Sequence, residues 1–400
     1  MTNSRKAFPT RAVHAGEHLP PGDYIPVVGP IHPTVGFVYE RMEDLDGVLG
    51  ATREGYVYPR YGSPTVAAFE TATADLEEGE AAYAFGSGMA AIHVALLTAG
   101  VRQGSSVLAA MDVYGATFTL LRRLFAEMGV KVRLVDVTDL KAVEAALDET
   151  HPVVLVAETI SNPLLKVADQ PALISLAHRH GAQVLIDNTF ASPYLFNPCI
   201  YGADYVMHSA TKFIAGHGDV LAGIIVTSTE NRKRMYELNK MIGSNLGPFE
   251  AWLAMRGLKT LPLRMRQQCE NSVRIAQWLA AHPRIARINY PGLPAHPQHE
   301  LARRLFQGRG FGAVLSFEIA GADKTVAFRF MDALDLCMAA TTLGDIYTIV
   351  LHPASSSHRA LSAAERAEVG ISDGLVRLSI GIEDADDIIA DLEQALDATN

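Results

Sequence analysis

Two hydrophobic periods alternate along residues 63 to about 250. Short apolar runs, which are typical of buried strands, alternate with longer segments. In these longer segments apolar residues recur at the spacing of an amphipathic helix. The predicted strands are AAYAF, SVLAAMD, KVRLVDV, PVVLVAET and QVLIDNT, and two shorter ones, ADYVMHSA and LAGIIVTS, flank a glycine-rich loop. Strands that alternate with helices usually form a parallel sheet, so the pattern predicts an α/β fold with a mostly parallel sheet flanked by helices.

The pattern differs on both sides of this region. Residues 1–62 are rich in Gly, Pro and Tyr and show no clear period, so we expect an irregular N-terminal arm with a functional role. From about residue 250 a long amphipathic helical stretch, interrupted at Pro262, precedes short strands such as GAVLSFEI and GLVRLSIG and a closing helix. We therefore expect three parts: the arm (1–62), a cofactor-binding α/β domain (63–257) and an α+β C-terminal domain (258–400).

The composition indicates which kinds of binding partner and which cellular compartment to expect. The chain has 400 residues, 49% of them hydrophobic, and a formal net charge of −10. An acidic chain without a dense Lys/Arg patch is not expected to bind nucleic acid or an anionic membrane. The first residues show no apolar signal region, and no run of about 18 apolar residues could cross a bilayer. Cys199, Cys269 and Cys337 lie far apart and predict no disulfide, so we expect a cytoplasmic protein.

The 14 histidines do not form a metal-binding motif. His178 and His180 lie two positions apart on a predicted helix and cannot face one ion together. The other histidine pairs lack a third ligand at motif spacing, so we expect no metal site.

The segment 187–219 carries candidate residues for a catalytic or cofactor-binding site. Asp187 follows the apolar strand QVLI, and open α/β sheets place ligands at the carboxyl ends of their strands. A carboxylate there can keep a pyridine nitrogen protonated, which makes the pyridoxal ring an electron sink. Lys212 comes 25 residues later, beside Thr211 and near Ser209. Its amine could form a Schiff base while the two hydroxyls bind a phosphate, although a lysine in isolation is more often an exposed surface residue.

Two further segments give weaker signals. Gly88 and Met89 open a predicted helix, whose free N–H groups can bind a phosphate, but small turns before helices are common. They do not match the dinucleotide motif G-x-G-x-x-G, and no acidic residue follows where it would bind a ribose. Tyr114 follows the strand VLAAM and could stack on a planar cofactor or act as an acid or base. In isolation a half-buried structural tyrosine is the better interpretation.

Taken together, these segments resemble a known family. YPRYGSPT, AFGSGMAAI, DNTFASPYLFNP, HSATKFIAGHGDVLAG and RLSIGIED occur in the order found in the Cys/Met-metabolism (trans-sulfuration) family of fold-type I pyridoxal-phosphate enzymes. The similarity runs from about residue 8 to the C-terminus. The family includes methionine γ-lyase, cystathionine γ-lyase, cystathionine γ-synthase and O-acetylhomoserine sulfhydrylase. The resemblance implies an enzyme of sulfur amino-acid metabolism with pyridoxal 5'-phosphate as its cofactor.

The resemblance also implies roles for individual residues. For the cofactor, the matching positions are Lys212 for the Schiff base, Asp187 for the pyridine nitrogen, Tyr114 for stacking, Asn162 for the phenolic oxygen, and Gly88, Met89, Ser209 and Thr211 for the phosphate. Lys212 and Tyr114 would be the catalytic residues. Arg377 would bind the substrate carboxylate, and Thr342 would also bind the substrate. Tyr58 and Arg60 would reach the phosphate of a neighbouring subunit, as in the family's tetramers of two active dimers, so we expect a homo-oligomer.

The turn AATTLGD bears on the reaction. Family members that handle cystathionine carry a Glu where this chain has Thr341 and a Ser where it has Thr342. The missing charge disfavours the distal ammonium group of cystathionine. We predict γ-elimination on sulfur amino acids such as methionine or homocysteine, which releases a thiol, 2-oxobutanoate and ammonia. Many methionine γ-lyases carry a Cys where this chain has Ala116, so γ-replacement on an O-acylhomoserine stays as the alternative.

Two other interpretations remain open at this stage. A transaminase or a non-catalytic pyridoxal-fold module could also contain an Asp and a Lys in this arrangement. The motifs YPRYGSPT and HSATKFIAGHGD weigh against a transaminase. The lack of a helix-turn-helix pattern or a basic extension weighs against a regulatory module.

Overall fold

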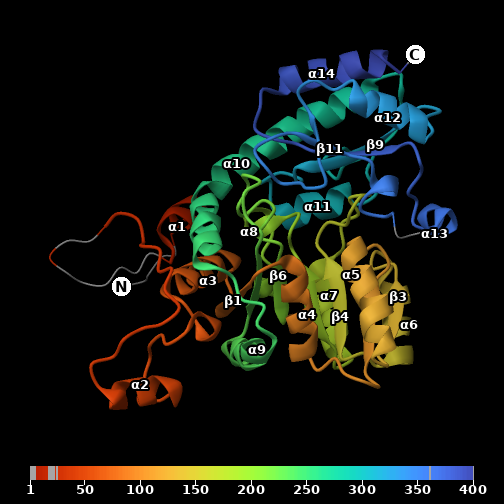
Figure 1. Cartoon of the computed structure of the whole chain (residues 1–400). Coiled ribbons are helices and arrows are strands. Elements are labelled where there is room, and N and C mark those ends of the chain that lie inside the picture. Colours follow the sequence, from red (N-terminus) through yellow and green to blue (C-terminus); the bar gives the residue numbers. More distant parts are fainter. Residues whose placement is uncertain (1–5, 17–22, 24–25, 360–361, 400) are drawn as a thin grey trace.

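A seven-stranded sheet forms the centre of the computed structural model, which describes residues 6–16, 23, 26–359 and 362–399 (Figure 1). The strand order is β1-β7-β6-β5-β4-β2-β3. The strands are β1 (Ala81–Phe85), β2 (Ser106–Ala110), β3 (Lys131–Val135), β4 (Val154–Glu158), β5 (Gln183–Asp187), β6 (Tyr205–His208) and β7 (Gly223–Thr227). Only β7 runs against its neighbours β1 and β6, so the predicted mostly parallel sheet is confirmed.

Helices cover both faces of this sheet because its strands are apolar on both sides. Val154 and Val156 of β4 pack in a hydrophobic cluster with α4, whereas Leu155 and Ala157 pack on the opposite face with α6 and α7. The helices of this region are α3 (Pro64–Glu77), α4 (Gly88–Thr98), α5 (Gly115–Thr119), α6 (Leu140–Thr150), α7 (Gln170–Arg179), α8 (Ser192–Leu195) and α9 (Thr229–Ile242), and α5 continues into π-helical turns at Leu120–Phe125.

A second sheet lies in the C-terminal region, where the sequence predicts an α+β arrangement. Its five strands have the order β10-β11-β12-β9-β8. They are β8 (Ile285–Asn289), β9 (Val314–Ile319), β10 (Met338–Ala339), β11 (Ile349–Leu351) and β12 (Leu375–Ser379). The helices are α10 (Pro248–Ala281), α11 (His299–Phe306), α12 (Lys324–Asp332), α13 (Ala363–Glu368) and α14 (Ala385–Asp397). Within the described part of the chain, none of the helices has the length and apolarity that crossing a membrane requires.

Helix α10 runs without a break through Pro262, so the expected interruption there is wrong. Proline removes one helical hydrogen bond, here the one that would reach the Leu258 carbonyl. The buried Arg264 supports this part of the helix, since its guanidinium donates to the Gly257 carbonyl at 2.8 Å and to the Phe213 carbonyl at 2.7 Å. The helix packs against α1 (Phe8–His14) and α3 at one end and against β8 and α14 at the other. The predicted boundary at 257/258 falls inside it, and the division into domains stays a prediction.

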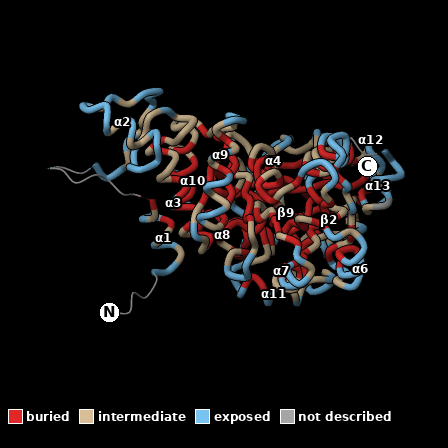
Figure 2. Tube along the Cα trace, turned by 90° about the horizontal axis from the view of Figure 1, so that it is seen from below, coloured by how far each residue is buried: buried red, intermediate tan, exposed pale blue. Residues whose placement is uncertain are grey.

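The N-terminal arm is less irregular than expected. It contains α1, α2 (Met42–Leu49) and a 3₁₀ turn at Pro59–Tyr61. The segment around α2 extends away from the body of the molecule, and its trace is mostly exposed (Figures 1 and 2). Val38 and Met42 expose 101% and 75% of their surface. Exposed apolar side chains of this kind mark a surface that contacts another molecule.

Candidate active site

A cavity of about 600 Å³ lies beyond the carboxyl ends of β4, β5 and β6. Parallel strands end together at one edge of a sheet, so residues far apart in the sequence meet there. Most of the predicted site residues line this cavity: Gly88, Met89, Tyr114, Asn162, Asp187, Ser209, Thr211, Lys212 and Arg377. Its volume falls within the roughly 300–1,000 Å³ range of small-molecule sites.

The Lys212 amine is held at the centre of the cavity by Thr342. The Lys212 Nζ donates to the Thr342 Oγ1 at 3.1 Å. Burial lowers the pKa of Lys212, the nearby Arg377 cation lowers it further, and Asp345 acts in the opposite direction. A lower pKa increases the fraction of neutral amine, which is the form that attacks a carbonyl group.

Asp187 ends β5 and faces the cavity with its charge supported by Thr189. The Thr189 hydroxyl and backbone N–H both donate to the Asp187 Oδ1, at 2.5 and 3.0 Å. Burial raises the pKa of Asp187, and these two hydrogen bonds lower it. A buried carboxylate with such support is suited to face a protonated ring nitrogen.

The turn after β5 is fixed from the other side of the sheet by a buried polar network. Asn188 donates to the Glu77 Oε1 at 2.7 Å, and the same oxygen lies 2.7 Å from the His208 Nε2. All three side chains are almost completely buried. Buried polar groups that satisfy one another specify a single arrangement, and here they hold the ends of β5 and β6 together.

The start of α4 forms a cradle for an anion. Ser87 is the N-cap, and its hydroxyl accepts the Ala90 N–H at 3.1 Å. A Cβ at Gly88 would lie 2.8 Å from the Met207 Cε and 3.1 Å from the Ser209 Cβ, so only glycine leaves the space open. The exposed N–H groups of this first turn and the Ser209 hydroxyl suit a phosphate.

Arg377 lies on β12 with only 3% of its surface exposed. It donates to the Asn162 Oδ1 at 3.1 Å and to the Thr342 carbonyl at 3.0 Å. Among the described residues its Nε has no hydrogen-bond partner. Burial lowers the pKa of Arg377 to about 10. A buried guanidinium with a donor left over is suited to bind a carboxylate.

Tyr58 and Arg60 do not line the cavity of their own chain. Arg60 donates to the Lys240 carbonyl at 2.6 Å, and its guanidinium lies over the rings of Tyr58 and Tyr61, at 5.6 and 4.9 Å from their centroids. Their expected role in a neighbouring subunit's site therefore stays a prediction.

Glu158 was missed by the sequence reasoning. It ends β4 directly opposite Asp187 in the sheet register and lines the same cavity. Its Oε1 accepts the Tyr114 N–H at 2.6 Å. Burial raises the pKa of Glu158 well above the ordinary value, and the charge of Asp187 raises it further. The signal was present in the sequence, since PVVLVAET and QVLIDNT each place an acidic residue at the end of an apolar strand.

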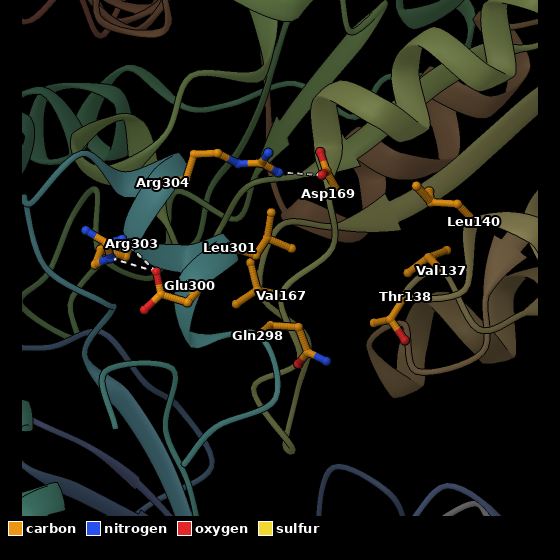
Figure 3. Close-up of a pocket in the computed structure, with 10 residues that line it drawn as sticks. All are labelled: Val137, Thr138, Leu140, Val167, Asp169, Gln298, Glu300, Leu301, Arg303 and Arg304. Carbon is orange, nitrogen blue, oxygen red and sulfur yellow. Dashed lines mark hydrogen bonds and ion pairs between the residues drawn. The ribbon is translucent and has the colours of Figure 1, made fainter. Parts of the chain in front are cut away.

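Another cavity, of about 840 Å³, lies between the segment after β3 and helix α11 (Figure 3). Its charged side chains are paired with each other. Arg304 forms an ion pair with Asp169 at 2.6 Å, and Arg303 forms one with Glu300 at 2.7 Å. Val137 and Val167 supply apolar surface. Among the described residues that line it, each acid is paired with an arginine, in contrast to the acids of the cavity around Lys212.

The sequence model of a family described as Cys/Met metabolism PLP-dependent enzyme matches residues 9–397. The chain belongs to this family. It is 42% identical over 405 residues to an L-methionine γ-lyase of Fusobacterium nucleatum subsp. polymorphum, an alignment that covers 99% of this chain and 100% of that protein. A cystathionine γ-synthase of Mycobacterium bovis is 43% identical over 394 residues (97% and 96% covered). An O-succinylhomoserine sulfhydrylase of Pseudomonas aeruginosa is 40% identical over 393 residues (98% and 96% covered).

A solved structure gives the same result for the fold. Cystathionine γ-synthase from Xanthomonas oryzae pv. oryzae, in complex with aminoacrylate and cysteine, superposes with a TM-score of 0.92 at 36% identity, covering 99% of both chains. The predicted family, fold class and enzyme class are confirmed, and the cofactor is pyridoxal phosphate.

The cavity residues fit this cofactor. The Gly88 cradle would hold the phosphate, Asp187 would face the pyridine nitrogen, and the Lys212 amine would carry the carbonyl carbon. Each group has the charge or hydrogen-bonding capacity that the corresponding part of the cofactor needs.

Proposed function

We propose that this enzyme eliminates the γ-substituent of sulfur amino acids such as methionine or homocysteine. The overall reaction consumes one water and releases a thiol, 2-oxobutanoate and ammonia. The observation that carries the proposal is the link from the Lys212 amine through Thr342 to Arg377, because it places a proton-transfer group beside a carboxylate clamp. Relatives named methionine γ-lyase at about 40% identity support the same reaction.

We assign the residues of the cavity separate roles in this reaction. Arg377 would bind the substrate carboxylate through its unpaired Nε and orient the Cα–H bond toward Lys212. The Lys212 amine would remove the Cα proton and return a proton later, and the Tyr114 phenol would protonate the departing sulfur. The bound cofactor supplies the electron sink that makes these proton transfers possible. Asn162 would hold the clamp in place, since its amide oxygen accepts from Arg377.

The neutral Thr341 belongs to the same cavity and supports a substrate without a distal ammonium group. γ-Replacement on an O-acylhomoserine is the second candidate. Relatives named O-succinylhomoserine sulfhydrylase and cystathionine γ-synthase favour it at similar identity. Both reactions share the early proton transfers and differ in whether a thiol adds before the product leaves.

We also propose that the enzyme works as a homo-oligomer, a tetramer of two active dimers in which Tyr58 and Arg60 reach the phosphate of a neighbouring subunit. The exposed apolar residues of the arm support this, as do the apolar side chains of Met241 and Phe249, which are 77% and 56% exposed. Arg60 contacts the same region through the Lys240 carbonyl. We place the enzyme in the cytoplasm, because its three cysteines are unpaired.

Product analysis tests the reaction. The purified holoenzyme is supplied with methionine, homocysteine, cystathionine and O-acetylhomoserine, each with and without sulfide. We expect 2-oxobutanoate and a thiol from methionine and homocysteine, with a lower kcat/KM for cystathionine. Sulfide-dependent replacement that far exceeds 2-oxobutanoate release would favour the sulfhydrylase instead, and a clear preference for cystathionine would contradict the argument from Thr341.

A further inference from the structure

Among the described residues that line the active-site cavity, the cationic ones are Lys212, Arg359 and Arg377. In the proposed reaction Arg377 binds the substrate carboxylate and Lys212 transfers protons, whereas Arg359 has no assigned role. Arg359 is exposed at the rim. Its backbone N–H donates to the Ser356 carbonyl at 3.2 Å, but its guanidinium forms no hydrogen bond or ion pair with any residue in the described part of the chain. A cation at the mouth of a substrate cavity with no internal partner is available to a ligand.

The acids of the cavity do not compete for this cation. Among the described residues that line it, the acidic ones are Glu158 and Asp187. Both lie at the strand ends, Glu158 buried and Asp187 partly buried. Both accept hydrogen bonds there: Glu158 from the Tyr114 N–H and Asp187 from Thr189. The charge of Arg359 is therefore not neutralised by the wall of its own site.

The loop that carries Arg359 is fixed in place. The Ser355 Oγ lies 2.8 Å from the His352 Nδ1, and the His358 N–H donates to the Pro353 carbonyl at 3.0 Å. The loop also packs against the backbone that follows Tyr114, because a Cβ on Gly115 would lie only 2.4 Å from the Ser357 carbonyl oxygen. The backbone that carries Arg359 therefore has a defined position relative to Tyr114, and the arginine side chain extends from it at the mouth of the cavity.

We propose that Arg359 binds an anionic group at the far end of the γ-substituent, so that the site favours amino acids with a second, distal carboxylate and no distal ammonium group. Arg377 then holds the α-carboxylate, and Arg359 holds the distal one. A homoserine ester whose acyl group ends in a carboxylate, the O-succinyl ester, has this chemistry. Methionine has no distal charge and gains nothing from Arg359. The inference rests on the proposed γ-chemistry and adds to it a residue that determines specificity.

Matched substrates test the proposal by kinetics. O-Succinylhomoserine and O-acetylhomoserine share the same leaving atom and differ mainly in the distal carboxylate. We expect the wild-type holoenzyme to show a higher kcat/KM for the succinyl ester. In Arg359→Gln this kcat/KM should fall by about tenfold through KM, the size typical of a charge-assisted contact, while that for the acetyl ester stays within about twofold. Arg359→Lys should retain part of the preference. Arg122→Gln, an exposed arginine that lines a neighbouring cavity, is the control and should change neither value.

Binding without turnover gives a second, independent measurement. L-2-Aminoadipate and L-norleucine differ in a terminal carboxylate and have no γ leaving group, so their binding can be followed by the change in the cofactor's absorption spectrum. We expect Arg359→Gln to weaken aminoadipate binding and leave norleucine binding unchanged. Equal effects on both members of either pair, or no effect on either, would overturn the proposal. Methionine turnover is measured in parallel. If methionine is not cleaved but Arg359→Gln still selectively weakens the carboxylate-bearing compounds, the proposed lyase reaction is wrong and the role of Arg359 is retained.

Discussion

The carboxyl groups of Glu158, which is buried, and Asp187, which is partly buried, lie at the ends of neighbouring strands, but their partners differ. Asp187 accepts two hydrogen bonds from Thr189, whereas the Glu158 carboxylate accepts the Tyr114 N–H. Burial raises the pKa of both, and like charges this close do not both ionise readily. We infer that Asp187 carries the charge opposite the pyridine nitrogen and that Glu158 stays protonated and positions Tyr114.

Glu158→Gln should therefore change how stability depends on pH. A carboxyl whose pKa is raised in the folded state destabilises the protein as pH rises, because only the unfolded chain ionises above about pH 4.3. The loss is about 1.4 kcal/mol per pH unit until the folded-state pKa is reached. The Gln variant keeps an oxygen for the Tyr114 N–H and avoids this loss.

Thermal unfolding of the holoenzyme at pH 5 and pH 8 measures the difference. The melting temperature of the Gln variant should rise relative to that of the wild type as pH rises from 5 to 8. Glu158→Ala should be less stable than the Gln variant at both pH values, because it removes the acceptor of the Tyr114 N–H, a loss of about 0.5–1.5 kcal/mol. A constant difference between wild type and the Gln variant across this range would show that Glu158 is ionised in the folded enzyme.

Reduction with borohydride checks the assignment of Lys212. Its lowered pKa and its contact with Thr342 make this amine our proposed site of the bond to the cofactor. The reduced protein should carry a pyridoxyl group on the Lys212 peptide after digestion. A label on a different lysine would overturn the assignment of the whole site.

Among individual residues, those that could be identified from the sequence as site residues have a chemistry that is unusual for their position. Asp187 and Lys212 stand out because a charge follows an apolar strand and a lysine stands between hydroxyls. Glu158 was overlooked because a single acid after a strand is ordinary until the pairing of β4 with β5 places it beside Asp187. Arg359 was overlooked for a related reason: nothing in the local sequence shows that the loop folds back to the cavity.

At the scale of elements, helix α4 ties the proposed phosphate site to the sheet. Gly88 is the first helical residue, and the space beside it is bounded by Met207 and Ser209. Gly88→Ala should weaken cofactor binding by about 1–3 kcal/mol, since the added methyl crowds the anion cradle. The dissociation constant of the cofactor, followed by its absorption during dialysis, measures the loss.

Gly47→Ala is the matched control for this change. Gly47 lies within α2, and a Cβ there would meet only ordinary contacts, the nearest at 3.4 Å. Alanine is the better helix former, so this variant should bind the cofactor normally and lose no stability. If Gly88→Ala also binds the cofactor normally, the phosphate does not occupy the cradle at the start of α4.

Strong periodicity predicted α3, α4, α6 and α7 and the strands between them, because each segment has one dominant pattern. The failure at Pro262 has a physical cause. A proline costs a helix one hydrogen bond and some strain. The local sequence cannot show that packing against α3 and the second sheet, together with the Arg264 contacts, offsets that cost. The short helices α1 and α2 lack a long apolar period and could not be distinguished from irregular chain.

At the scale of the whole molecule, the N-terminal arm has two parts: α1 packs against α10 and α3 of its own chain, whereas the segment around α2 extends away from it (Figure 1). Its exposed apolar residues and the position of Tyr58 and Arg60 outside their own cavity favour an interface with a second copy of the chain. The resemblance of YPRYGSPT to the family motif predicts this arrangement. The hydrophobic pattern and the composition of the chain could not have predicted it, because they do not show which surface contacts a second subunit.

Subunit mixing tests the shared site. Arg60→Ala should weaken cofactor retention, because it would remove a phosphate ligand donated by the neighbouring subunit. Lys212→Ala should be inactive. A mixed dimer contains one site built from the intact Lys212 of one chain and the intact Arg60 of the other, so refolded or co-expressed mixtures should recover activity above both parents. Arg41→Ala, an exposed arginine of the arm that pairs with Glu43, is the control partner and should leave activity unchanged by itself. If hybrids form, as shown by tagged purification, and their activity never exceeds that of the parents, each subunit completes its own site and the arm serves assembly alone.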